Sequence, residues 1–437
     1  MTTAPALMRP AFATDVGISA RRPLGLKLAL GLLLCLLFSI IFAPEFSREG
    51  VAPAGSTIYS KAVGGFRFID LVIIALVFVH IVCLGCLRRK VLSFPRPLLL
   101  PGMAFLVCVA VAFGYGHSRG GSNLFFDWRG LALGVGMYVV WASWLRSHED
   151  VKLAIRVFAI YMAARISLLY VLYAAGYRDT LLGISIPVFD GPVLSCVVFT
   201  ALLALSYQGA AHQQTRRFAA TFLAAGASVM VLLCMRRTYW GELGIGVLIL
   251  LRKRHRVRNL MIMAAALALA AGVLGSSFSN RLQSFDVRQA DTQFSSDNAD
   301  HVYDLIDAWE QVRQKPVMGI GLGTSYSTWH IRNWKSESVM VHNAPLHVWL
   351  KYGLAGMLCY IWFHLALLRW LYCQATAPAG VERAFLLSAF AYLAAQFIVT
   401  LGFAPWPYSE LQLTVLMSFM IAAAVAASRQ SLCIRHQ

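Results

Sequence analysis

Long apolar runs alternate with short polar segments along almost the whole chain. A helix needs roughly 20 mostly apolar residues to cross the ~30 Å hydrocarbon core of a bilayer, and about twelve runs approach that length. The pattern predicts an all-α polytopic membrane protein with about twelve transmembrane helices. The runs begin near residues 25, 69, 98, 129, 153, 191, 218, 238, 259, 344, 384 and 410.

Composition supports a membrane protein, and the positions of the Lys and Arg residues account for the basic charge. Hydrophobic residues make up 59% of the chain and charged residues only 13%, whereas a water-soluble domain carries about 25% charged residues. The net charge of +18 would ordinarily suggest a polyanion such as nucleic acid. With both termini in the cytoplasm, however, most Lys and Arg residues fall on the cytoplasmic side, as the positive-inside rule requires. We therefore interpret the positive charge as a signal of membrane topology, and we expect no nucleic-acid partner.

The polar segments divide the chain into three parts. Residues 1–276 hold the first nine spans, residues 277–343 form one long external loop, and residues 344–437 hold three more spans and a short cytoplasmic tail. The first run, 25–43, follows basic residues as a signal peptide does. It is longer than a usual signal-peptide core and lacks a clear cleavage site, which predicts a retained span.

The long loop is expected to contain an amphipathic helix over 300–315. Its apolar residues recur at helical spacing, so the helix should lie on the bilayer surface or cap the spans. Pro316 ends it, and a glycine run follows whose backbone N–H groups could meet phosphate or sugar oxygens, or simply form a flexible turn. The apolar residues are Val302, Leu305, Ile306, Trp309 and Val312.

His342 and Asn343 stand where the loop re-enters the membrane, just before Pro345. Asn and Pro at this place are ordinary helix-start chemistry, so Asn343 alone is mainly structural. His342 could take a proton from the hydroxyl of a bound acceptor. The residues alone do not decide whether His342 is catalytic or structural.

Several arginines lie at or below the outer surface. The run after Arg237 has only 14 residues, which span ~21 Å and draw Arg237 inward. Its guanidinium would then either bind phosphate in a cavity or extend to lipid headgroups. Arg165, in the middle of the fifth run, either lines the same cavity or pairs with Asp70, Asp190 or Glu242. Arg129, at the external end of the fourth run, and Arg281 and Arg288, at the start of the loop, complete the set.

Two motifs in the C-terminal half resemble those of the O-antigen ligase and polymerase superfamily of bacterial membrane glycosyltransferases. The run P-x-x-G-x-G-x-G begins at Pro316 and precedes H-N-x-x-L-x-x-W-x-x-x-G-x-x-G, which begins at His342. Upstream, RRTY around Arg237 and DWRG around Arg129 resemble the family's Ser-Arg-Gly/Thr and Asp-x-Arg-Gly elements. The chain departs from the family at Arg236, where a small residue is usual, and at His301, where relatives often have Arg.

The resemblance implies a GT-C-like enzyme of the bacterial inner membrane with a periplasmic active site. It would move a glycan from undecaprenyl diphosphate to lipid A-core, with inversion at the anomeric carbon. The implied catalytic residues are His342 as general base and Arg237 and Arg288, favoured over Arg281, as stabilisers of the diphosphate. The implied substrate-binding residues are Arg129, Arg165, Arg281, His301, Gly321, Gly323 and Asn343. No cofactor is expected, and no metal, since the sequence has no Asp-x-Asp or other acid pair at that spacing.

Two other functions remain open on sequence grounds. An O-antigen or exopolysaccharide polymerase uses the same donor but passes the glycan to a second lipid-linked repeat. A lipid-linked glycan transporter would also place arginines in a cavity, but it would be expected to show inverted repeats. The first and last six runs show no such repeat, and the single large external loop favours chemistry on one face.

Overall fold

The chain is described here by a computed structural model. The structure describes residues 30–34, 38, 62–63, 66–86, 94–176, 178–181, 184–187, 191–210, 213–234, 236–251, 256–274, 295–327, 337–338, 341–375, 380–402 and 411–434.

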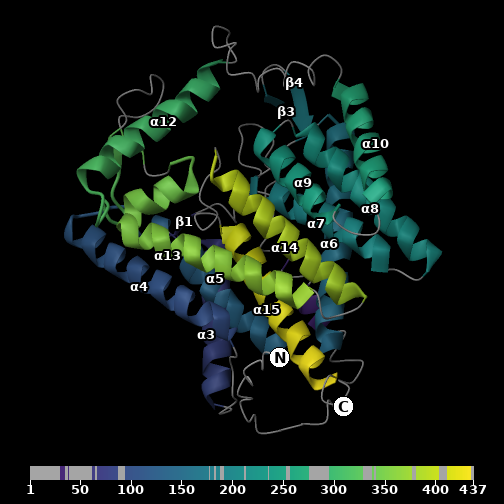
Figure 1. The fold of residues 1–437 in the computed structure, drawn as a ribbon, viewed down its shortest axis with the longest axis horizontal. Coiled ribbons are helices and arrows are strands. Elements are labelled where there is room, and N and C mark those ends of the chain that lie inside the picture. The colour runs from purple at the N-terminus through teal and green to yellow at the C-terminus, as the bar shows by residue number, and fades with distance from the viewer. Residues whose placement is uncertain are drawn as a thin grey trace, which may run out of the picture.

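Helices dominate the described part of the chain (Figure 1). They are α3 (Phe68–Cys86), α4 (Arg96–Ser118), α5 (Leu124–Trp144), α6 (His148–Ala174), α7 (Gly191–Ala210), α8 (Gln214–Leu233), α9 (Arg237–Leu250), α10 (Arg256–Leu274), α12 (Ser295–Gln314), α13 (Ala344–Ala375), α14 (Val381–Thr400) and α15 (Leu411–Ile434). Short antiparallel pairs join β1 (Ala62–Val63) with β2 (Phe66–Arg67), β3 (Arg178–Leu181) with β4 (Ile184–Pro187), and β5 (Tyr326–Ser327) with β6 (Glu337–Ser338).

The helices coincide with the predicted apolar runs. In the described residues five helices, α4, α6, α8, α13 and α14, are long and apolar enough to cross a membrane. The helix α9 has 14 residues, the short length expected from the sequence. Large apolar side chains such as Phe78, Phe218 and Phe222 are exposed, which suits lipid and not water. The chain is thus a helical membrane protein, while the total of about twelve spans stays a prediction.

The short strand pairs were not predicted. The pair β3–β4 aligns Arg178 with Pro187 and connects α6 to α7, and β1–β2 leads directly into α3. Such hairpins satisfy backbone groups in the segments between helices, where the apolar periodicity used to find spans gives no signal.

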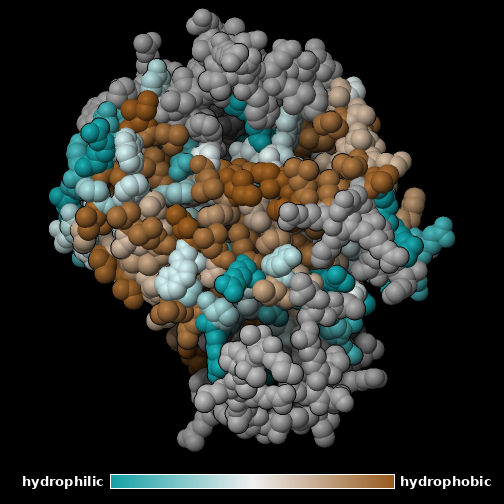
Figure 2. Space-filling view, in the orientation of Figure 1, coloured by the Kyte–Doolittle hydropathy of each residue, from teal (hydrophilic) through white to brown (hydrophobic). Residues whose placement is uncertain are grey.

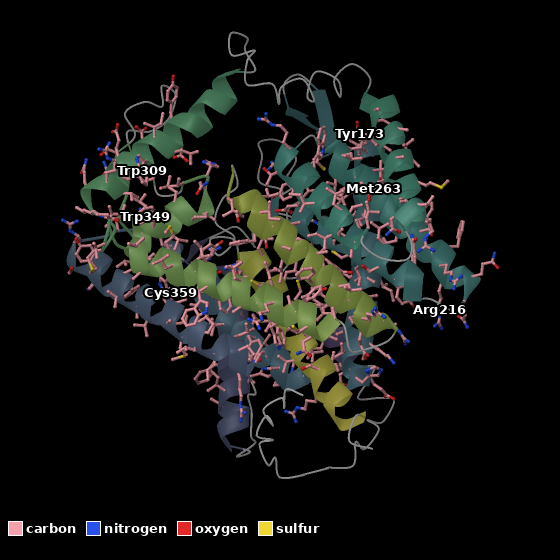
Figure 3. All side chains as sticks on the ribbon, viewed as in Figure 1. Tyr173, Arg216, Met263, Trp309, Trp349 and Cys359 are labelled. Atoms are coloured by element: carbon pink, nitrogen blue, oxygen red, sulfur yellow. The ribbon has the colours of Figure 1, made fainter. Side chains whose placement is uncertain are left out.

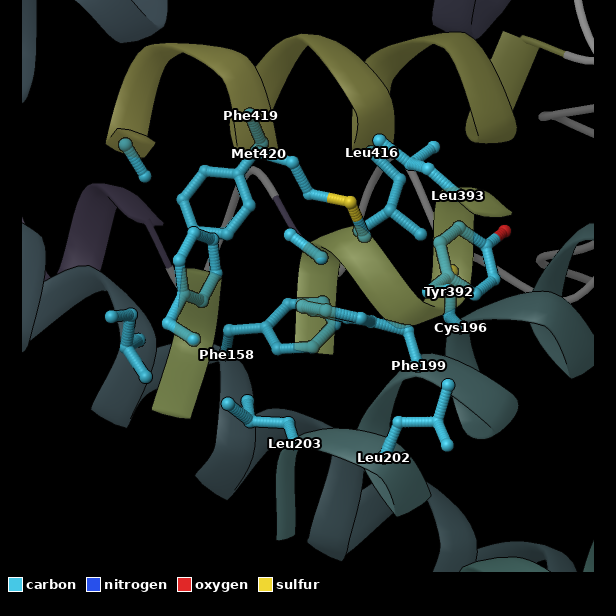
Figure 4. Close-up of a cluster of buried hydrophobic side chains, with 14 of the residues drawn as sticks. Phe158, Cys196, Phe199, Leu202, Leu203, Tyr392, Leu393, Leu416, Phe419 and Met420 are labelled. Carbon is cyan, nitrogen blue, oxygen red and sulfur yellow. The ribbon is translucent and has the colours of Figure 1, made fainter. Parts of the chain in front are cut away.

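Close helix packing builds the interior. The helix α7 lies against α8, α9 and α14, while α15 packs on α5 and α13 packs on α4. Between α6, α7, α14 and α15 lies a cluster of aromatic rings (Figure 4), in which Phe199 is 5.6 Å from Phe158 and 5.7 Å from Tyr392, centroid to centroid. Within lipid, this kind of van der Waals fit holds helices together.

One end of the bundle differs from the other. An apolar band crosses the middle of the face shown in Figure 2, with hydrophilic atoms above and below it. Trp309 of α12 and Tyr173 near the end of α6 lie towards one end, and Arg216 at the start of α8 lies away from them (Figure 3). The cytoplasmic location expected for Arg216 stays a prediction.

The helix α13 is kinked at Gly353, which has φ of 74°. A Cβ atom there would lie 1.9 Å from the carbonyl oxygen of Val317, so the close approach of the glycine run excludes any side chain. Across the kink, the N–H of Leu354 donates to the carbonyl of Pro316 at 3.1 Å. The segment after Pro316 therefore replaces part of the helical hydrogen bonding of α13.

The predicted loop helix is present as α12, and its place on the bilayer surface or over the spans stays a prediction. Its apolar residues do not form one inner face, because Val312 is buried while Ile306 and Trp309 are exposed. Asp304 and Asp307 are buried instead. The helix was predicted, but its rotation was not: it turns two acids inward and aromatic and aliphatic side chains outward.

Candidate active site

Helix-start chemistry fixes the position of His342. The next residue, Asn343, accepts a hydrogen bond from the N–H of Leu346 at 2.9 Å, as an N-cap does. The Asn343 amide also donates to the carbonyls of Leu401 (2.8 Å) and Gly402 (3.0 Å) at the end of α14. The expected capping role of Asn343 is confirmed, and its role in substrate binding stays a prediction.

The His342 ring lies against a carboxylate of α12. Its Nδ1 is 3.1 Å from Oδ2 of Asp304, and the backbone N–H of His342 donates to the same oxygen at 2.8 Å. The Asp304 side chain is 5% exposed and the His342 side chain 22% exposed. The hydroxyl of Tyr326 on β5 donates to the other oxygen of Asp304.

These contacts determine the charge of Asp304. Burial by itself would raise the pKa of its carboxyl, but the hydrogen bonds from the His342 ring, the Tyr326 hydroxyl and the His342 N–H hold the pKa below its ordinary value. Asp304 is therefore an anion at neutral pH, directly beside a partly exposed imidazole.

Asp304 and Tyr326 were not predicted as site residues. The sequence did carry a signal: acids at 300, 304 and 307 recur at helical spacing within the predicted loop helix. That spacing indicates a face, but it does not show that the face turns towards His342.

Arg237 is the first residue of α9 and is partly buried. One turn later, an ideal Cβ on Gly241 would lie 3.3 Å from Cγ2 of Val399 on α14. The end of α14 thus touches α9 one turn after Arg237 and also binds Asn343, next to His342. Arg237 and His342 therefore lie at the same end of the bundle.

Arg129 is buried on α5, and its Nε lies 3.4 Å from Oδ1 of Asp70 on α3. Asp70 was one of three partners considered for Arg165, and the structure pairs it with Arg129. Glu242, another of the three, accepts a hydrogen bond from Ser195 at 3.5 Å. Arg165 is partly buried on α6. Substrate binding by Arg129 and Arg165 stays a prediction.

The predicted loop arginines, Arg281 and Arg288, lie outside the described residues, as does Asp190. His301 belongs to α12, but its side chain is not among those described. Their expected roles stay predictions.

The glycine run packs against three helices. A Cβ on Gly321 would lie 2.7 Å from Cα of Gly116 on α4, and φ of Gly321 is 90°. The N–H of Gly323 donates to Oδ2 of Asp127 on α5 at 2.8 Å. Close approach between backbones thus accounts for these glycines, and the N–H of Gly323 is already bonded within the protein. Substrate binding by Gly321 and Gly323 stays untested.

Asp127 also holds a buried lysine. Nζ of Lys351 on α13 lies 2.9 Å from Oδ2 of Asp127 and donates to the carbonyl of Thr324, and the lysine side chain is fully buried. This ion pair joins the DWRG element, the glycine run and α13. Sequence reasoning missed it, although a lysine within an apolar run does call for an anionic partner.

Within the described part of the chain, no group of three or more His, Cys, Asp or Glu side chains is arranged to hold a metal ion. The residues of the site that the structure does bring together are hydrogen-bonding and charged groups that suit proton transfer and anion binding.

Comparison with known proteins finds a family match over part of the chain. No curated protein matches the chain. Residues 221–361 match the family model described as O-Antigen ligase, and this segment includes Arg237, Asp304, the glycine run, His342 and Lys351. Residues 221–361 are thus similar to the O-Antigen ligase family, and this match supports the superfamily that the sequence motifs resemble.

Proposed function

We propose that this protein transfers O-antigen glycan from undecaprenyl diphosphate to lipid A-core on the periplasmic face of the bacterial inner membrane. In this proposal both termini are cytoplasmic, and the end of the bundle that carries α12 and His342 faces the periplasm.

One observation carries the proposal: the end of α14 contacts the turn of α9 that follows Arg237 and also binds Asn343, beside His342. A guanidinium suited to phosphate and an imidazole suited to proton transfer thus lie at one end of the bundle, within the segment that matches the family. Transfer of a glycan from a lipid diphosphate needs both groups.

In the proposed reaction His342 is the general base. It takes the proton of the acceptor hydroxyl while that oxygen attacks the anomeric carbon from the side opposite the diphosphate, so the configuration inverts. The bond from the anomeric carbon to the phosphate oxygen breaks, and its electron pair leaves with the diphosphate.

Arg237 and the loop arginine Arg288 are proposed to stabilise the departing diphosphate. Fixed guanidiniums in a site that excludes water stabilise developing negative charge without reorganising, and each can make two parallel hydrogen bonds to phosphate. Arginines in this role make a metal unnecessary. We therefore expect transfer to survive treatment with a chelator, and a loss that Mg²⁺ or Mn²⁺ restores would contradict this.

Mass analysis of lipopolysaccharide from a strain that lacks the protein tests the proposal. Bare core together with accumulated lipid-linked polymer is the result expected for a ligase. Core carrying a single repeat would identify a polymerase instead, and bare core with unpolymerised donor trapped on the cytoplasmic side would indicate a transporter.

A further inference from the structure

We propose that Asp304 is a positioning residue for His342, which holds the imidazole in the tautomer that a general base requires. This inference rests on the proposed function, because it assigns Asp304 a part in the same proton transfer.

The first argument is geometric. One oxygen of Asp304 receives both the backbone N–H of His342, at 2.8 Å, and the ring Nδ1, at 3.1 Å. Two contacts from the same residue to one atom fix the place of the residue and also the rotation of its ring. A carboxylate can only accept hydrogen bonds, so the proton of the neutral imidazole belongs on Nδ1 and the lone pair on Nε2.

The second argument concerns how Asp304 is itself held. Its other oxygen receives the hydroxyl of Tyr326, and its side chain is almost completely buried. The carboxylate is therefore fixed by three hydrogen bonds from two separate segments, β5 and the entry to α13. A side chain held in this way can orient another, since it has little freedom to turn aside.

Neighbouring groups have contacts of their own. Among the described residues, Tyr326 on β5 contacts Asp304, and His347 on α13 lies close enough to His342 and Lys351 to be affected by their charges. Nδ1 of His347 accepts the N–H of Val341 at 3.3 Å, and Lys351 is paired with Asp127. In the described part of the chain, the carboxylate in contact with the His342 ring is that of Asp304.

During transfer, the proton of the acceptor hydroxyl moves to Nε2 of His342 and the ring becomes a cation. Asp304 keeps its negative charge and its hydrogen bond to Nδ1, so the new cation is paired where it forms. The proton later leaves from Nε2 to solvent or to the released diphosphate, and His342 returns to its starting tautomer.

Asp304→Asn tests the inference in purified enzyme reconstituted in liposomes, with an undecaprenyl diphosphate-linked glycan as donor and lipid A-core as acceptor. We expect kcat to fall by about 10²- to 10⁴-fold, with KM for the donor nearly unchanged.

Asp307→Asn is the matched control, since it removes a second buried carboxylate from the same helix. It should leave kcat close to that of the unsubstituted protein. If Asp304→Asn keeps near-normal kcat, or lowers kcat no more than Asp307→Asn does, Asp304 only supports the fold and the inference is wrong.

A second measurement needs no variant of Asp304. The ¹⁵N resonances of histidine-labelled protein, assigned by comparison with His342→Gln, should show His342 protonated at Nδ1 and not at Nε2 at neutral pH. The opposite tautomer would overturn the inference. Full transfer by His342→Ala would instead contradict the general base in the proposed function, so the two failures are distinguishable.

Discussion

Replacing Lys351 by Met should destabilise the protein strongly. The ammonium of Lys351 is fully buried and lies 2.9 Å from Oδ2 of Asp127, whose own side chain is 6% exposed. Without the lysine, the Asp127 charge stays buried and keeps the hydrogen bond from the N–H of Gly323. Removal of one partner from a buried ion pair costs about 3–5 kcal/mol, because the other charge is left uncompensated.

The double variant Asp127→Asn/Lys351→Met separates this effect from simple loss of packing. It removes both charges together, so it should be more stable than the sum of the single variants implies, with a coupling energy of about 0.5–3 kcal/mol. Arg313→Met, at an exposed position of α12, is the surface control and should change stability by less than about 0.5 kcal/mol.

The assay is reversible unfolding in mixed micelles with increasing SDS, followed by tryptophan fluorescence. If Lys351→Met unfolds at the same SDS fraction as the unsubstituted protein, the buried pair has no structural role. If the two single effects simply add in the double variant, Asp127 and Lys351 do not stabilise each other and the reasoning fails.

Three further predictions concern Arg237, Gly353 and Asp304. Arg237→Lys should lose most of its turnover, since lysine cannot form the paired hydrogen bonds to phosphate; normal donor binding and kcat in the liposome assay would refute this. Gly353→Ala should destabilise the kink of α13, because the new Cβ would meet the Val317 carbonyl at 1.9 Å and φ is positive; an unchanged unfolding midpoint would contradict it. The lowered pKa of Asp304 means that its ionised form stabilises the fold at neutral pH and that this contribution is lost as pH falls below about 4. The stability difference between the unsubstituted protein and Asp304→Asn should therefore shrink in acid, and a constant difference would rule this out.

The sequence predicted what depends on local pattern. Apolar length located the helices, including the short α9, and the Asn-x-Pro arrangement after His342 predicted the start of α13. These features are set by residues close together in the chain, whose hydrogen bonds and spacing can be reasoned from the sequence alone.

Contacts between distant segments were not predictable in the same way. Asp127 and Lys351 are 224 residues apart in the sequence, and Asp304 and His342 are 38 apart. Whether Asp304 faces His342 depends on the rotation of α12, and its apolar residues occupy both the buried and the exposed faces. A period of 3.6 residues places side chains on faces, but packing decides which face turns inward.

The glycine run shows a related difficulty. Its spacing suited either phosphate binding or a flexible turn, and the structure adds a third reason for glycine, namely the close approach of its backbone to Gly116 and Gly353. Such an approach involves three segments of the chain, and only their assembly reveals it.

The central claim is that His342 carries out proton transfer and is not needed for folding. The most direct test measures glycan transfer by purified His342→Ala in liposomes, with its unfolding midpoint measured in parallel. We predict loss of transfer by about 10²-fold or more with a nearly unchanged midpoint. Full transfer by the folded variant would contradict the claim.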